Sequence, residues 1–369
     1  MLKYLFYSIL ILLLLNSCIS NSNKFYINGY YDVDDNTRID LLKTIDSRPT
    51  VVASTKVFGG KYSFEGTIDR PTLFTIHAKY KKEPVYLFVE PGDINIRTIS
   101  GTYQDRTFVD GSKSHRLFES YLRIEKRFAR KIDTLKSNYS FATQIRDTNT
   151  IENIEKTYVA QKKSIINSKI NFIKKHNSSE VSLFFLLNEL AYNIPTKQLK
   201  EIVNLLDPKL NDCEYFLELN KTINKLEKIE IGKIAPNFYA ENQYGVESNL
   251  HEIIKKNKVI ILDFWASWCG PCRGENHILK DLYEKYKQKG LEIVSFSLDV
   301  NKDFWKRAIR EDQINWINLT DYKQWKSDVI KQYCIKAIPK KFIIDSQGKI
   351  IASDVSKDDV ESIILKVLN

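Results

Sequence analysis

The sequence predicts three folded regions: an all-β, sandwich-like domain over residues 24–112, a helical connecting region over 113–230 and an α/β domain over 231–369. The apolar spacing changes from short alternating runs to the helical period near residue 113, and strand and helix patterns alternate beyond residue 231. At 369 residues the chain is too long for one average domain. Hydrophobic residues make up 43% of it, so most of the chain can bury enough apolar surface to fold.

Short β segments characterise the first region. Tyr62–Gly66 and Val85–Val89 are typical, and glycine and proline turns such as Gly59-Gly60 and Pro91-Gly92-Asp93 separate such segments. Many short strands with frequent turns indicate a small antiparallel sandwich or barrel. No catalytic motif occurs in this region.

We expect the helical region to have a structural role. Apolar residues recur at three- to five-residue steps among lysines and asparagines, at Ile151, Ile154, Tyr158, Ile165, Ile170 and Ile173. We expect these positions to pack between the outer domains or to form part of a dimer surface. Cys213 lies in this region without a companion, and because free cysteine is among the most buried residue types we interpret it as a core residue.

Strands and helices alternate in the last region. Val259–Phe264 has the pattern of a buried strand, Pro271–Lys289 that of a helix and Leu291–Leu298 that of the next strand, an order that implies a parallel sheet. Further strands are predicted at Lys341–Ile344 and Lys349–Ala352.

Cys269 and Cys272 stand two residues apart between a predicted strand and a predicted helix. Two thiols at this spacing can close a small disulfide ring reversibly. Because a helix N-terminus stabilises an anion, Cys269 is expected to be the nucleophile and Cys272 the thiol that resolves the mixed disulfide. A zinc site would need a second ligand pair, which His251 and His277 do not provide, so we expect no metal and no other cofactor.

The segment Asp263–Arg273, DFWASWCGPCR, resembles the thioredoxin active-site segment almost residue for residue. From Gly232 to the C-terminus the chain is more similar to the TlpA/ResA-like envelope branch, through the opening Gly232–Phe238, Glu275 and an insert from Asn301 to Trp316. The resemblance implies a thioredoxin fold, thiol-disulfide oxidoreductase activity and a substrate-binding surface that includes Trp268, Gly270 and Pro271.

The N-terminal region carries a looser resemblance. Its strand-turn rhythm, the turn Glu90–Asp93 and the boundary Asp110–Ser112 are similar to a β-rich domain of unknown function that often precedes thioredoxin modules in envelope lipoproteins.

Ile338-Pro339 matches the element that the thioredoxin family holds in the cis form opposite the disulfide. The resemblance implies that the Ile338 backbone pairs with an extended substrate segment. An ordinary turn proline is the alternative.

Asp263 lies in an apolar run, where burial tends to raise the pKa of a carboxyl group. It matches the thioredoxin acid that accepts the proton of the resolving cysteine, although an aspartate that faces water at the strand end is the alternative. Thioredoxin pairs this acid with a lysine on the next strand, where Ser295 stands here.

Three further positions depart from the family or stand outside its motif. His277 replaces a usual proline and is expected at the surface, while Lys340-Lys341 follows Pro339 where threonine is usual. A cation there would lower the pKa of Cys269 or favour acidic substrates. Cys334 is expected to be a core residue, with a third redox thiol as the alternative.

Residues 1–17 have the pattern of a signal peptide, with Lys3 followed by the apolar run Tyr4–Leu15. Leu15-Asn16-Ser17-Cys18 resembles a lipoprotein processing box, which implies lipidation of Cys18 and a periplasm-facing place in the cell envelope. A plain secretory signal is the alternative. The net charge is +10, but the basic residues are spread along the chain, so we expect no nucleic-acid partner.

Gly270-Pro271 lacks the histidine found in strongly oxidising relatives, which favours a reductase of protein disulfides. The resemblance implies a thiol-type membrane electron donor, with misoxidised envelope proteins or apocytochrome c, and hence cytochrome c biogenesis, as candidate targets. The alternatives are a thioredoxin-fold peroxidase and a non-catalytic binding lipoprotein.

Overall fold

The computed structural model describes residues 23–45, 48–79, 81, 83–101, 105–355 and 357–368. The chain forms two compact units, and each consists of more than one segment. The first contains residues up to 186 together with 205–216, and the second contains 187–204 together with the residues from 217 onward. The predicted boundary at 230/231 therefore falls inside the second unit, and the three-region division stays a prediction.

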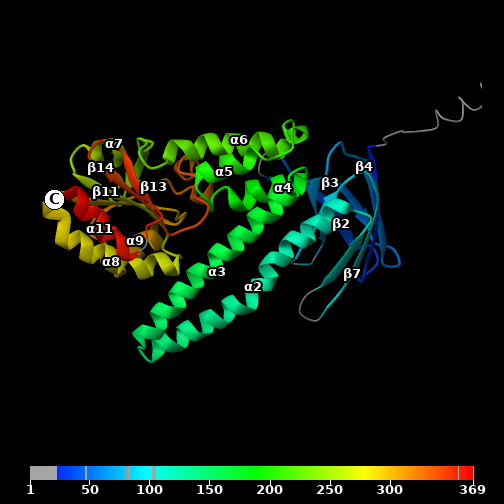
Figure 1. The fold of residues 1–369 in the computed structure, drawn as a ribbon, viewed down its shortest axis with the longest axis horizontal. Helices are drawn as coiled ribbons and strands as arrows, with labels where there is room; N and C mark the ends of the chain where they lie inside the picture. The colour runs from blue at the N-terminus through cyan, green and yellow to red at the C-terminus, as the bar shows by residue number, and fades with distance from the viewer. Residues whose placement is uncertain are drawn as a thin grey trace, which may run out of the picture. The chain divides into compact units, whose positions relative to one another are not determined.

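The first unit holds a β-sandwich of two four-stranded sheets (Figure 1). The strands of one sheet are, in spatial order, β4 (Lys61–Thr67), β1 (Lys24–Tyr31), β7 (Gly92–Ile99) and β8 (Arg106–Asp110). Those of the other are β3 (Arg48–Lys56), β2 (Arg38–Ile45), β5 (Thr72–Ala78) and β6 (Val85–Val89). The predicted all-β architecture is confirmed, although β1 and β7 pair in parallel rather than antiparallel.

Side-chain alternation builds the core of the sandwich. Buried and exposed residues alternate strictly along β1, because successive side chains of a strand point to opposite faces of its sheet. Ile27, Leu87 and Ile94 are among the fully buried residues in this core.

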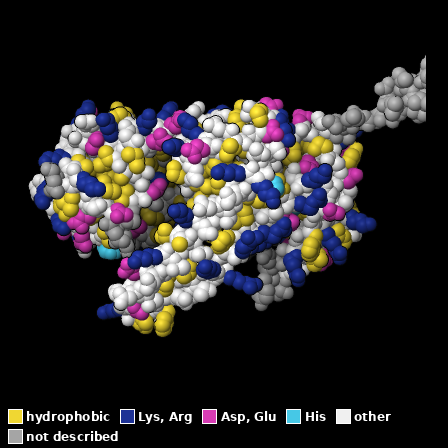
Figure 2. All heavy atoms as spheres, viewed as in Figure 1, with side chains coloured by type: hydrophobic (Ala, Val, Ile, Leu, Met, Phe, Trp, Pro, Cys, Tyr) yellow, Lys and Arg dark blue, Asp and Glu magenta, His cyan; other side chains and the backbone are white. Residues whose placement is uncertain are grey.

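Two long helices follow the sandwich, α2 (Lys113–Gln144) and α3 (Thr148–Lys175), and Figure 1 shows them side by side as an antiparallel hairpin. Ser112 caps α2 by accepting a hydrogen bond from the backbone N–H of His115. Ile170 and Ile173 of α3 are buried, whereas the predicted apolar positions Ile151 and Ile154 are only half-buried. The exposed side of α2 carries lysine and arginine side chains, which Figure 2 shows along this helix.

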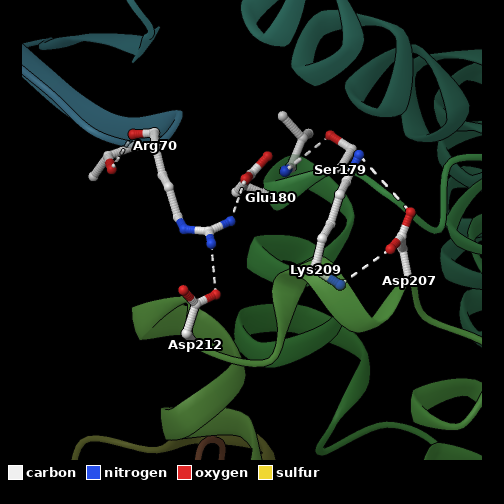
Figure 3. A network of polar contacts seen from close by, with 8 residues as sticks. Arg70, Ser179, Glu180, Asp207, Lys209 and Asp212 are labelled. Atoms are coloured by element: carbon white, nitrogen blue, oxygen red, sulfur yellow. Dashed lines mark hydrogen bonds and ion pairs between the residues drawn. The ribbon is translucent and has the colours of Figure 1, made fainter. Parts of the chain in front are cut away.

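Arg70 joins the sandwich to the helices of the same unit (Figure 3). Its guanidinium lies 2.5 Å from Asp212 and 3.5 Å from Glu180 of α4 (Glu180–Phe185). The Tyr215 hydroxyl, in the first turn of α6 (Glu214–Leu226), accepts a hydrogen bond from the Leu73 backbone N–H at 3.0 Å. A cavity of about 660 Å³ lies beside these contacts and is lined by both sheets and by residues 212–215.

The second unit is built on a seven-stranded sheet. In spatial order the strands are β10 (Glu247–Asn249), β9 (Tyr239–Asn242), β13 (Ile317–Thr320), β12 (Leu291–Ser297), β11 (Val259–Trp265), β14 (Lys340–Asp345) and β15 (Ile350–Ser353). Every residue of β11 is buried, as expected of a central strand.

The expectation of a parallel sheet holds only at the centre. β11, β12 and β13 run parallel, whereas β14 pairs antiparallel with β11, β15 with β14, and β9 with β13. Two neighbouring strands can run parallel only when a long crossover connection joins them. A tight turn joins β14 to β15, so these two strands run antiparallel.

Besides the part of α6 from residue 217 onward, this unit contains further helices. They are α5 (Thr196–Val203), α7 (Leu250–Ile254), α8 (Gly270–Tyr286), α9 (Lys302–Glu311), α10 (Asp328–Gln332) and α11 (Lys357–Leu368). One-turn helices occur at Pro208–Leu210 in the first unit and at Glu227–Ile229, Lys287–Lys289 and Gln324–Lys326 in the second, and a π-helical turn at Leu186–Leu190. Across the described ranges, none of the helices combines the length and the apolar character that crossing a membrane requires.

Candidate active site

Cys269 is the N-cap residue of α8. Its backbone is extended, and its sulfur accepts a hydrogen bond from the backbone N–H of Cys272 at 3.2 Å. Pro271 occupies the first turn, where a residue without an N–H costs the helix nothing. The unpaired N–H groups and the helix dipole therefore act directly on the Cys269 sulfur and favour its thiolate form.

Cys269 and Cys272 form a disulfide, with their Cα atoms 5.3 Å apart. The two residues are 6% and 2% exposed, so a partner reaches Cys269 more readily than Cys272. Trp268, at 52% exposure, and the exposed Gly270 and Pro271 surround the pair. The structure thus brings the predicted redox pair and three of the four predicted substrate-binding residues together in one segment.

The Ile338–Pro339 peptide bond is cis, as the family resemblance implied. Both residues are half-buried and immediately precede β14, which pairs with the active-site strand β11. Ile338 packs against the core cluster that includes Cys269 and Cys272, and its role toward a substrate stays a prediction.

Asp263 lies buried in the middle of the sheet and not at a wet strand end. In the strand register it stands between Ser295 of β12 and Lys341 of β14. The Ser295 hydroxyl donates to its Oδ2 atom at 3.2 Å, and the Lys341 ammonium lies 3.7 Å from Oδ1. Burial raises the pKa of the Asp263 carboxyl, against the opposing attraction of Lys341.

Lys341 takes part in ion pairs. Its ammonium contacts Glu275 and lies 3.7 Å from Asp263, and the residue is 8% exposed, so it is not a free cation. The expected effect of Lys340-Lys341 on Cys269 or on acidic substrates stays a prediction. The ammonium of Lys340 contacts Asp354. Neighbouring side chains of a strand point to opposite faces of its sheet, so the ammonium groups of Lys340 and Lys341 reach different partners.

Asp299 supports the loop before the cysteines, and sequence reasoning missed it. It accepts hydrogen bonds from the backbone N–H and the hydroxyl of Ser267, and from the Ser297 hydroxyl at 2.7 Å. The residue is 2% exposed and lies two residues after the end of β12. A carboxylate shortly after a buried strand, at the edge where the parallel strands β11 and β12 both end, was the available signal.

Arg273 anchors the start of α8 and was also not predicted to do so. Its guanidinium donates to both carboxylate oxygens of Asp312 and to Glu311, at the C-terminal end of α9. Asn276, one turn later, donates to Asp312 as well. The helix that carries the cysteines is thereby fixed to the C-terminal end of α9.

The remaining predicted positions are spread more widely. His277 is exposed and Cys213 is buried, as expected, and burial raises the pKa of the Cys213 thiol. Cys334 is half-buried against the core, at a left-handed backbone position with φ 52°. Burial raises the pKa of its thiol, which favours the unreactive form. Cys18 lies outside the described residues.

Known families match both ends of the chain. The model of the AhpC/TSA family matches residues 231–353, and that of a domain of unknown function, DUF4369, matches residues 25–118. The thiol-disulfide oxidoreductase ResA of Bacillus cereus is 33% identical over 147 residues, which cover 39% of this chain and 82% of that protein. The chain belongs to the ResA family of thiol-disulfide oxidoreductases.

A further relative and two solved structures are also similar to part of this chain. ResA of Bacillus subtilis is 29% identical over 125 residues, which cover 34% of this chain and 67% of the relative. The crystal structure of the thioredoxin domain of a thiol-disulfide oxidoreductase from Bacteroides vulgatus is 32% identical, with a TM-score of 0.36, and the match covers 38% of this chain and 99% of that one. A thiol-disulfide oxidoreductase from Bacteroides fragilis is 31% identical, with a TM-score of 0.35 and coverage of 36% and 98%.

Three expectations are therefore confirmed at the level of the family. The C-terminal part has a thioredoxin fold and the protein is a thiol-disulfide oxidoreductase, so this activity is favoured over a peroxidase or a non-catalytic binding protein. The loose resemblance of the N-terminal part is confirmed by the DUF4369 match.

Proposed function

We propose that this oxidoreductase reduces protein disulfides in the cell envelope through Cys269 and Cys272. The observation that carries the proposal is the position of the Cys269 sulfur, which caps α8 and at the same time is bonded to Cys272. Once the disulfide is reduced, the same helix terminus stabilises Cys269 as a thiolate.

The reaction then has two exchange steps. The Cys269 thiolate attacks one sulfur of a substrate disulfide, forms a mixed disulfide and releases the other substrate sulfur as a thiolate, which takes a proton from water. Cys272 loses its proton and attacks Cys269, so the Cys269–Cys272 disulfide forms and the second substrate thiol leaves. The substrate gains two electrons and the enzyme loses them.

Asp263 has the burial, and the place in the thioredoxin-like segment, expected of the base for the second step. Its carboxylate would accept the Cys272 proton, and a carboxyl with a raised pKa is matched to proton exchange closer to neutral pH than an ordinary aspartate is. Pro339 would shape the surface opposite the cysteines. Trp268, Gly270, Pro271 and the Ile338 backbone would contact the substrate.

The reducing direction follows from the residues between the cysteines. The side chains of Gly270 and Pro271 supply no hydrogen-bond donor or positive charge that would over-stabilise the thiolate, and over-stabilised thiolates make oxidising proteins. An exported reductase has to be recharged, so the proposal includes a thiol-type electron donor in the membrane.

The cellular setting rests on the first residues. The apolar run that ends at Leu15-Asn16-Ser17-Cys18 supports export and lipidation of Cys18, and thereby a lipid-anchored, periplasm-facing protein. Disulfide-containing envelope proteins, including apocytochrome c, would then be the substrates.

Reduction of insulin by dithiothreitol tests the proposal. The reduced protein should accelerate precipitation of the insulin B chain, the Cys269→Ser variant should not, and the Cys213→Ser variant should match the natural protein because Cys213 lies in the other compact unit. Equal rates for the natural protein and Cys269→Ser would contradict the proposal. Rapid consumption of hydrogen peroxide instead would favour the peroxidase.

A further inference from the structure

Two carboxylates, those of Asp263 and Glu275, lie close to the ammonium of Lys341. Asp263 comes from β11, Lys341 from the neighbouring strand β14 and Glu275 from α8. The Lys341 ammonium contacts Glu275 directly and lies 3.7 Å from Asp263, so it bridges the two acids.

The surroundings of this group are well defined. On β12, Ser295 donates to Asp263 and itself accepts a hydrogen bond from the Trp316 indole at 2.8 Å. A cavity of about 10 Å³, lined by Glu275 and Lys341, is otherwise bounded by apolar side chains of Ile278, Leu279, Leu282, Val355 and Val360. Among the residues that the structure describes, the neighbouring elements therefore place Ser295 and Trp316 around the group as polar partners and line its cavity with apolar side chains.

The charges of the three groups do not balance when all are ionised. Two carboxylates and one ammonium leave a net charge of −1, and a buried uncompensated charge is costly. One proton shared between the acids makes the group neutral. The two acids differ in access to water, because the side chain of Asp263 is 3% exposed and that of Glu275 is 36% exposed.

The helix also connects this group to the resolving thiol. Glu275 follows Cys272 by three residues on α8, and residues at this spacing share one face of a helix. Two acids are thus available to a proton that leaves Cys272: the buried Asp263 on β11 and the half-exposed Glu275 on the same face of α8.

We propose that Lys341 is a positioning residue that holds Asp263 and Glu275 as one proton site, in which the buried acid receives the proton and the half-exposed acid returns it to water. The ammonium comes from β14, whereas the resemblance to thioredoxin led us to look for it on β12, where Ser295 stands. The inference rests on the proposed role of Asp263 in the second exchange step.

Because Lys341 and Glu275 carry opposite charges, removing one or the other should shift the pH profile of the second step in opposite directions. Without the ammonium, Asp263 loses its attraction to a positive charge and holds its proton more tightly, so Lys341→Met should move the pH profile of the second step to higher pH by about one to three pH units. At pH 7 the step should be about tenfold slower or more, and it should recover in alkaline solution. Without the second carboxylate the repulsion disappears, so Glu275→Gln should move the profile to lower pH.

A chromophoric aromatic disulfide separates the two steps, because the first coloured thiolate is released by attack of Cys269 and the second by resolution. Stopped-flow measurements from pH 5 to 9 would compare Lys341→Met, Glu275→Gln and Asp263→Asn. Lys340→Met is the matched control, because its ammonium contacts Asp354 and not this group. The control should keep the natural profile, and Lys341→Arg should restore most of it.

The outcomes distinguish the inference from the proposal beneath it. If Asp263→Asn slows the second release but Lys341→Met has the profile of Lys340→Met, the inference about Lys341 is overturned. If Asp263→Asn changes neither release, the proposed role of Asp263 fails, and the carbon-13 carboxyl titration of Asp263 in the oxidised Lys341→Met protein still reports whether Lys341 governs that acid. Should Lys341→Met not fold, Glu275→Gln decides, and a profile that does not move to lower pH overturns the inference.

Discussion

Asp299 accepts two hydrogen bonds from Ser267, one from the backbone N–H at 2.9 Å and one from the hydroxyl at 2.5 Å. Ser267 lies two residues before Cys269, so this buried carboxylate holds the loop that presents the nucleophile.

Replacement of Asp299 by alanine should therefore loosen this loop. The Ser267 groups would lose their partner, which should lower the free energy of unfolding by about 1 to 3 kcal/mol and slow insulin reduction. Urea unfolding of the oxidised protein measures the first effect. Asp281→Ala, an exposed acid on α8, is the control, and equal losses in both variants would show that Asp299 does not support the loop.

The division of labour between the cysteines predicts a covalent trap. In Cys272→Ser the mixed disulfide on Cys269 still forms but lacks its intramolecular escape, so complexes with substrates should accumulate on non-reducing gels. Cys269→Ser should trap few or none, because Cys272 is less exposed. Equal trapping would reverse the two roles, and a Cys272→Ser trap that persists only after Cys334→Ser is added would make Cys334 a third redox thiol.

The buried carboxyl of Asp263 predicts a pH-dependent stability. Because its pKa is raised above the ordinary value of 3.8 in the folded protein, its contribution is fully present at low pH and is lost as pH rises through the raised pKa. Relative to Asp263→Asn, the natural protein should lose up to about 1.4 kcal/mol per pH unit from about pH 4 upward. Urea unfolding of both proteins between pH 4 and 8 measures the difference, and a constant difference would mean that the carboxyl is not perturbed.

The lipoprotein motif predicts membrane attachment through Cys18. Cys18→Ser should release the protein from the membrane fraction or leave the precursor unprocessed, whereas Ser20→Ala should change neither. Mass spectrometry of the mature N-terminus is the measurement. An unmodified terminus at another residue would refute lipidation.

The sequence predicted those parts of the candidate site that lie within one continuous segment or one family motif. The apolar run of β11, the helix that follows Cys269 and the place of Ser295 beside Asp263 all follow from continuous segments or from a family motif. Lys341 and Asp299 depend on which strands become neighbours and in which register, and no local period encodes that. Ile151 and Ile154 show the same limit, because the helical period was visible but the depth of burial depends on what covers each helix.

The polypeptide passes between its two compact units three times, at 186/187, 204/205 and 216/217. A protease that nicks the chain at 204/205 would leave residues 205–216 in the second fragment, although the partners of Arg70 and Leu73 in this segment, Asp212 and Tyr215, belong to the fold of the first. The two fragments would separate in detergent but would migrate together on a native gel. A cut in the backbone at 204/205 would therefore not by itself take the first unit apart.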